Sequence, residues 1–247
     1  RGFTTRLAFL SNADLSVPWS TDNYMGDVIM PGSPEGRFGM EVAGTTVWNS
    51  SATGGPGITS YGLSNYTIYG RCKSVDWDGN YAGIDVHMTY IMDTTKTYYR
   101  ILISLTNTTP LPKSNVYFYK SLDPDNNQDV GWGFSTTNTV EANPTPFCPK
   151  ALVSALSVAP GGGTDTPAYF GLGGIGSDIR VARGSFFVTD GSDVYDGTGP
   201  MIGVVGSTAF ADQAIAICHR DVTLAAGATS EFEFVVIMAE EELEEAL

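Results

Sequence analysis

Residues 83–106, GIDVHMTYIMDTTKTYYRILISLT, carry the two clearest β-strand patterns of the chain. In the first half, apolar and polar residues alternate, as a half-buried strand requires. One face carries Ile84, Val86, Met88 and Tyr90, and the other carries Asp85, His87 and Thr89. The second half, 97–106, is rich in β-branched and aromatic residues, which favour strands. The stretch therefore predicts two successive strands.

The same kind of pattern extends in both directions along the chain. We count about a dozen short strands between Gly- and Pro-rich turns and almost no helical period, which is typical of an all-β sandwich or barrel. Among them, 66–75 is predicted to be one strand and VTLAAGATSEFEFVVIMA, 222–239, a final hairpin, whereas 190–200 is predicted to be a loop. The sequence favours a large antiparallel β-sandwich with long Gly/Pro-rich loops. We expect residues 1–238 to form one such domain and residues 239–247, which include EEELEEAL, to form a short acidic helical tail or linker.

Composition limits the classes of protein to which the chain can belong. It has 247 residues, of which 42% are hydrophobic, so it is long and apolar enough to bury a core. Charged residues make up only 16%, which suits an extracellular β-structure. The net charge of −14 repels phosphates, so we expect no nucleic-acid partner. The sequence contains no apolar run of about eighteen residues, so we expect no membrane insertion.

A possible cation loop follows the strand pattern VYFYKSL. Oxygen-bearing side chains occur there at every second position: Asp123, Asp125, Asn127 and Asp129. This spacing resembles the opening of a calcium loop. Gln128 replaces the expected glycine, however, and Phe134 stands where a bidentate carboxylate belongs. Calcium is therefore one prediction, and a polar turn whose Asp and Asn side chains bond their own backbone is the other.

The three cysteines allow at most one internal disulfide. Cys72 with Cys148 is the bridge that we consider. Cys218 lies in an apolar run and is predicted to be a small buried side chain. Cysteine usage does not fix the redox compartment.

Four stretches share a pattern with a known family: YYRILISLTNTTP, VYFYKSLDPDNNQ, FSTTNTV and ADQAIAICHRDVTLAAGATSEFEFVVIM. They resemble a β-sandwich module of large secreted or surface-attached bacterial proteins, including adhesin-like chains. The resemblance implies a supersandwich-type fold without enzymatic activity. The chain departs from that pattern at Trp132 and lacks glycine-aspartate nonapeptide repeats, so the resemblance implies no calcium-repeat function.

The imidazole bases available for catalysis are His87 and His219. An enzyme acting on a sugar would need one of them to meet a carboxylate in a cleft. We predict structural or surface histidines instead, and hence no enzyme. The nearby VDWDGN, residues 75–80, is predicted to be a hairpin turn at Asp78–Gly79 and not a cation loop.

These observations lead to three functional hypotheses. The first is a non-catalytic structural or adhesive module of an extracellular surface or fibre assembly, whose partners are copies of itself, other assembly subunits or glycans. Trp19, Trp77 and Trp132 are its proposed sugar contacts, with core or edge packing as the alternative for each. The second is a phage virion protein of the tail or capsid decoration. The third is a carbohydrate-active enzyme.

Overall fold

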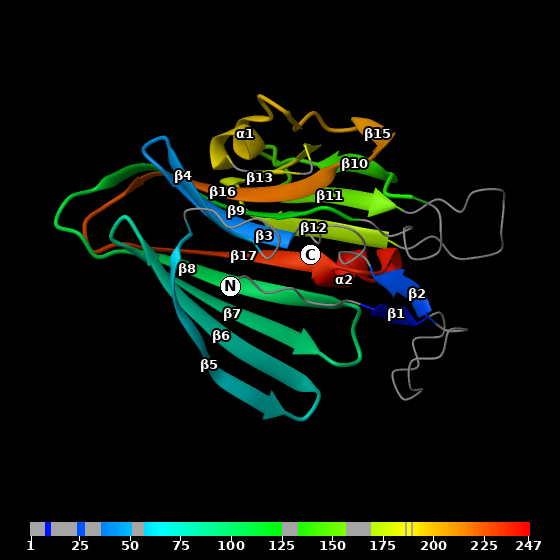
Figure 1. The fold of residues 1–247 in the computed structure, drawn as a ribbon, viewed down its shortest axis with the longest axis horizontal. Coiled ribbons are helices and arrows are strands. Elements are labelled where there is room, and N and C mark those ends of the chain that lie inside the picture. The colour runs from blue at the N-terminus through cyan, green and yellow to red at the C-terminus, as the bar shows by residue number, and fades with distance from the viewer. Residues whose placement is uncertain are drawn as a thin grey trace.

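The computed structural model describes residues 8–10, 24–27, 36–50, 57–124, 133–156, 169–185, 187–188 and 190–247. These residues form two large antiparallel sheets and a small two-stranded one, so the predicted all-β sandwich is confirmed (Figure 1). Neither helix in this part of the chain has the length and apolar character that a membrane crossing requires.

The larger sheet has nine strands. In spatial order they are β15 (Thr208–Ala211), β10 (Thr136–Ala142), β11 (Lys150–Leu156), β12 (Tyr169–Ile175), β17 (Thr229–Ile237), β8 (Tyr98–Asn107), β7 (Ile84–Asp93), β6 (Cys72–Tyr81) and β5 (Thr59–Tyr69). The strands β15 and β5 therefore form its two edges, at opposite margins of the molecule in Figure 1.

The smaller main sheet has six strands. In spatial order they are β14 (Met201–Ile202), β13 (Ile179–Gly184), β16 (Ala214–Leu224), β9 (Lys113–Leu122), β3 (Gly36–Val42) and β4 (Thr45–Ser50). The small sheet pairs β1 (Ala8–Leu10) with β2 (Tyr24–Asp27).

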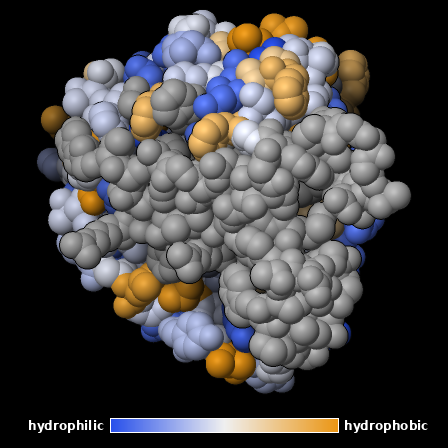
Figure 2. Space-filling model, turned by 45° about the vertical axis from the view of Figure 1, so that its right-hand side comes forward, coloured by the Kyte–Doolittle hydropathy of each residue, from blue (hydrophilic) through white to orange (hydrophobic). Residues whose placement is uncertain are grey.

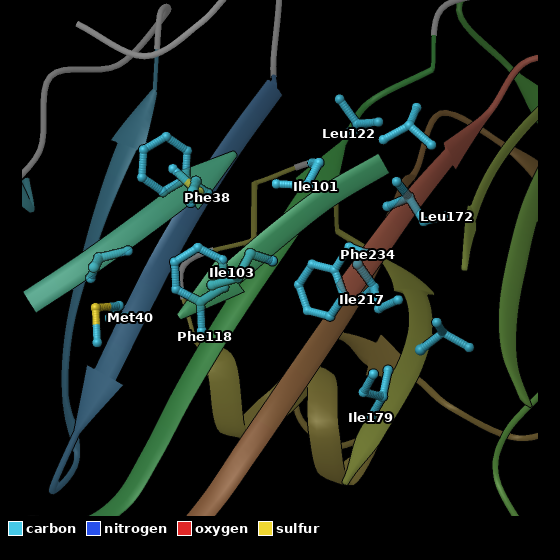
Figure 3. Packing of buried hydrophobic residues seen from close by; sticks show 14 of the residues in the cluster. Phe38, Met40, Ile101, Ile103, Phe118, Leu122, Leu172, Ile179, Ile217 and Phe234 are labelled. Atoms are coloured by element: carbon cyan, nitrogen blue, oxygen red, sulfur yellow. The ribbon is translucent and has the colours of Figure 1, made fainter. Parts of the chain in front are cut away.

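The core lies between the two main sheets. Alternating residues of β7 and β8 enter it as predicted, with Ile84 and Leu105 fully buried. Figure 3 shows apolar side chains from both sheets pointing toward one another, among them Phe118 of β9 and Phe234 of β17. Burying each such side chain stabilises the fold by about 1.5–3 kcal/mol. This contact fixes the two sheets face to face.

Two short helices cover parts of the outer faces. The helix α1 (Gly191–Asp196) lies over the six-stranded sheet, in a segment that the sequence predicts to be a loop. It forms because Asp190 accepts a hydrogen bond from the backbone N–H of Ser192, and because Gly197 ends it at φ 64°.

The C-terminal tail is helical, as predicted, and it packs on the nine-stranded sheet. It consists of a 3₁₀ turn (Glu240–Glu242) and α2 (Leu243–Ala246). Ala246 is buried in an apolar cluster with Leu152 and Val235. Helices this short are unstable in isolation, so these tertiary contacts hold the tail in place.

Two predicted connections are wrong. The stretch 66–75, predicted as one strand, contains the turn between β5 and β6, with Gly70 at φ 59°. The last two strands, predicted as a hairpin, belong to different sheets, because β16 pairs with β9 and β13 whereas β17 pairs with β8 and β12. The turn between them carries the chain from one layer of the sandwich to the other.

The Cys72–Cys148 disulfide is also wrong, because all three cysteines are free. Cys72 begins β6, and Cys148 precedes β11, five strand positions away in the sheet order. At about 4.8 Å per strand, this separation is several times the Cα distance that a disulfide spans. Cys218 is buried, as predicted.

Candidate functional site: a groove on the nine-stranded sheet

A groove of about 450 Å³ opens on the outer face of the nine-stranded sheet, over β7, β8 and β17. It is lined by His87, Thr89, Leu102, Ile103, Ser104, Glu231, Phe232 and Glu233. The alternation of the strands turns His87, Ser104 and Glu231 outward. Because Ile103 and Phe232 occupy core positions of the same strands, we expect them to meet the groove mainly through their backbone.

His87 lies at the centre of a hydrogen-bonded array. Its Nδ1 is 2.7 Å from Oδ1 of Asp78, and its Nε2 is 3.2 Å from Oγ1 of Thr89. Thr89 in turn donates its hydroxyl proton to Oδ1 of Asp76, at 2.7 Å. With that proton committed, Thr89 can only accept from His87, so the array is complete when the imidazole carries a proton on each nitrogen.

The carboxylate at the far end of the array is held ionised. Burial acts to raise the pKa of Asp76, but hydrogen bonds from Asn65 and Thr89 and the charge of His87 outweigh it. The pKa of Asp76 therefore lies below its ordinary value. A charged Asp76 completes the chain of donors and acceptors that orients His87.

The opposite wall of the groove is also acidic. Glu231 is exposed, and Glu233 forms a 2.7 Å ion pair with Arg100. Arg100 also donates to the backbone carbonyl of Ala246, at 3.2 Å. The ion pair thus joins the groove to the docked tail and leaves the Glu231 carboxylate facing solvent.

The sequence missed Asp78 because it placed the turn at Asp78–Gly79. Both residues lie within β6, and the turn is at Ala82–Gly83, where φ is 53° and 76°. This register pairs Asp78 with His87 and leaves Asp85 bonded to Asn80. An Asp-Gly pair is a stronger hairpin signal than an Ala-Gly pair, so the local sequence favoured the wrong turn.

The second histidine, His219 of β16, is buried. Its ring stacks on Phe232 of the other sheet, with centroids 3.9 Å apart and planes at 15°. Nε2 of His219 lies 3.4 Å from Oδ2 of Asp221, which also accepts a 2.9 Å hydrogen bond from Ser230 on its other oxygen. His219 therefore occupies a structural position between the sheets, as predicted.

Of the three predicted sugar-contact tryptophans, Trp77 is the one that lies within the described residues. Trp77 lies in the core at 3% exposure, packs edge-on against Phe38 and donates from Nε1 to Ser60. This position matches the packing alternative and leaves no ring face open to a sugar. Trp19 and Trp132 lie outside the described residues.

The predicted calcium loop is only partly visible. Asp123 is buried at the end of β9, and Asp125, Asn127 and Asp129 lie outside the described residues. Within the ranges that the structure describes, no three His, Cys, Asp or Glu side chains are arranged to hold a metal ion. Calcium at this loop stays a prediction.

No family model and no curated protein matches this chain. Among solved structures, it is similar to a heparan sulfate lyase from Pedobacter heparinus, with 8% identity and a TM-score of 0.41 over 80% of this chain. It is also similar to another polysaccharide lyase, with 15% identity and a TM-score of 0.38 over 82% of this chain. The matches span only 23% and 25% of those proteins. Similarity this low carries no argument about activity.

Proposed function

We propose that this chain is a non-catalytic structural or adhesive module of an extracellular assembly and that the groove around His87 binds a glycan. The observation that carries the proposal is the groove itself, about 450 Å³ on an open sheet face and lined by imidazole, hydroxyl and carboxylate groups. This volume lies within the range of small-molecule sites.

The chemistry of the lining indicates which glycans would fit. Hydroxyl groups of a sugar both donate and accept, and the groove offers carboxylate acceptors beside the Ser104 and Thr89 hydroxyls. Of the described residues that line it, Phe232 is the one aromatic, and its ring stacks on His219. Recognition would therefore depend on hydrogen bonds and not on ring stacking.

Charge narrows the choice further. Glu231 and Glu233 line the groove, and Asp76 and Asp78 bond Thr89 and His87 beside it. Arg100, paired with Glu233, is the cation next to them. Like charges in a shared cleft repel, so a polyuronate or sulfated chain would bind weakly. We expect a neutral oligosaccharide to bind best.

The extracellular location and the structural role have separate support. The chain has a low share of charged residues, 16%, and it resembles adhesin-like modules in the stretches described above. If calcium participates, the loop that begins at Asp123 is its proposed site. Light scattering of the purified chain with calcium and then with a chelator would test that part, and assemblies that shrink on chelation would support it.

Calorimetric titration with a neutral hexasaccharide, cellohexaose, and with hexagalacturonate tests the glycan proposal. We expect the neutral sugar to bind the wild type more tightly, and His87→Ala and Glu231→Ala to weaken it about tenfold or more each. Phe210→Ala, at an exposed position of β15, is the matched control and should bind like the wild type. Equal binding by all variants would contradict the proposal.

One observation favours an enzyme as the second candidate. An exposed imidazole 2.7 Å from a carboxylate, with glutamates across a groove, is an arrangement that can transfer protons. If the chain is a carbohydrate-active enzyme, it should turn over a glycan, and His87→Ala and Asp78→Asn should abolish that turnover. The non-catalytic proposal expects no new chain ends or unsaturated products with any variant.

A further inference from the structure

The edge strand β5 is exposed on both of its faces. It has eleven residues, pairs with β6 on one side, and has no neighbour on its other side among the described strands. Its large exposed side chains are Tyr61, Leu63, Tyr66, Ile68 and Tyr69, each at least 56% accessible. Figure 2 shows separate hydrophobic patches at the lower margin of the molecule, at the level that β5 and β6 occupy in Figure 1, and others at its upper margin.

The sequence of β5 lacks the charges and prolines that protect many edge strands, and its protection within the described residues is limited to two bulges. TSYGLSNYTIY contains no Lys, Arg, Asp, Glu or Pro, which are the residues that keep natural edges from pairing. The other edges of the two main sheets are shorter: β4 has six residues, β15 four and β14 two. A long, uncharged and apolar edge is a ready template for another strand.

We infer that β5 pairs antiparallel with β5 of a second copy of this chain across a two-fold axis. In the register that pairs the whole strand, Ser64 meets Ser64 of the other copy at the axis, and Thr59 meets Tyr69. The two nine-stranded sheets then form one continuous sheet. The β5–β5 interface would be isologous, which means that both copies contribute the same surface, as in most two-fold dimers.

Charge favours this site for contact between two copies. Each chain carries −14, so two copies repel one another wherever acidic surfaces meet. The strand β5 has no charge of its own. The acidic tail is a less favourable contact between two copies, because its carboxylates stay largely exposed although Glu242 and Glu245 pair with Lys96 and Glu244 lies 3.5 Å from Lys150.

The shape of β5 also favours its own copy over a foreign strand. The register with β6 shifts between Ser60 and Gly62 and again between Ser64 and Thr67, and Asn65 has a φ of 51°. Such bulges bend a strand and hinder pairing with a flat partner. A second β5 has the same bends, and in the register centred on Ser64 residues 60–62 of one copy face residues 66–68 of the other, so that bulged segments lie opposite one another.

This inference rests on the assembly part of the proposed function and is independent of the glycan groove. The experiment is light scattering over a range of concentrations for wild type, Ile68→Lys and the control Phe210→Lys. Both substituted residues are exposed, at 61% and 63%, on opposite edges of the same sheet. We expect wild type and Phe210→Lys to dimerise alike. For Ile68→Lys we expect a dimer dissociation constant at least tenfold higher, so that this variant remains monomeric up to higher concentrations.

A cross-link tests the register directly. Ser64→Cys in a Cys72→Ser, Cys148→Ser background should give a disulfide-linked dimer on oxidation, because facing Cα atoms in an antiparallel pair lie within disulfide reach. Phe210→Cys in the same background should not give a disulfide-linked dimer. A wild type that is monomeric at every concentration, or an Ile68→Lys variant that dimerises like Phe210→Lys, would overturn the inference.

The cellohexaose titration of Ile68→Lys separates the two proposals. If monomeric Ile68→Lys still binds the sugar, the groove functions without the dimer. If the wild-type dimer does not bind the sugar, the glycan proposal is contradicted and the β5 contact is unaffected.

Discussion

The two histidines lie in contrasting regions on either side of one sheet. His87 is on the outer face of the nine-stranded sheet, with 45% of its side chain exposed and with Asp78 and Thr89 as partners. His219 is enclosed between the sheets at 8% and stacks on Phe232, a residue that also lines the groove of His87. The same residue type thus belongs to a solvent-facing hydrogen-bonded array in one region and to packing in the other. The neighbours supplied by strand register decide which.

The largest stability effect is expected in the interior. Phe234→Ala should lower the free energy of unfolding by about 3–5 kcal/mol, because it leaves a cavity among fully buried side chains. Glu231→Ala, three residues earlier on β17 and exposed, should change it by less than about 0.5 kcal/mol. Denaturant unfolding measures both. Similar losses of stability for the two variants would show that the outer face is as well packed as the core, and would contradict the contrast between the two regions.

His219→Ala should have an intermediate effect. It removes the stack on Phe232 and the contact with Asp221, for an expected loss of about 1–3 kcal/mol. Val222→Ala, at an exposed position of the same strand, is the control and should be nearly neutral. An unchanged free energy of unfolding for His219→Ala would mean that the contacts of His219 with Phe232 and Asp221 do not stabilise the fold.

A buried carboxyl on the other outer face gives a pH-dependent effect. Burial, with the hydrogen bond to Asp190, raises the pKa of Glu41 from its ordinary 4.5 to about 7. The folded chain therefore holds a proton that the unfolded chain has lost, and the free energy of unfolding falls as pH rises from about 4.5 to about 7. The pKa of Asp190 is lowered from 3.8, so its own effect lies below this window.

Thermal unfolding across that window measures the effect. We expect the raised pKa of Glu41 to account for a fall of about 1–2 kcal/mol in the free energy of unfolding across this window. Glu41→Gln should remove this part of the pH dependence, because its side chain stays neutral. Glu231→Gln, which changes an exposed carboxyl on the other sheet, should leave the Glu41 contribution in place. A wild-type profile with the same slope as Glu41→Gln would contradict the raised pKa.

Local patterns in the sequence were sufficient for the strands but not for their partners. The alternation in 83–92 correctly assigned the buried face of β7 and placed His87 on the polar face. Asp78 was misplaced because a turn at Asp78–Gly79 and one at Ala82–Gly83 both satisfy local rules, and only the full pairing of β6 with β7 distinguishes them. A four-residue error in one turn was enough to hide the array.

Longer-range features were beyond local reasoning. The turn at 225–228 has the sequence of a hairpin, yet it joins two sheets, because β17 pairs with β8 along nine positions. Glu231 and Glu233 reach the groove only through that pairing. Trp77 likewise is buried because β3 supplies Phe38 above it, a contact that spans distant parts of the chain.

The most direct test of the groove is one calorimetric comparison with cellohexaose across wild type, His87→Ala and His219→Ala. We expect an affinity at least tenfold weaker for His87→Ala and within about twofold of wild type for a folded His219→Ala. Equal affinities for wild type and His87→Ala, or a loss confined to His219→Ala, would contradict the claim that the outer face of the nine-stranded sheet is the binding surface.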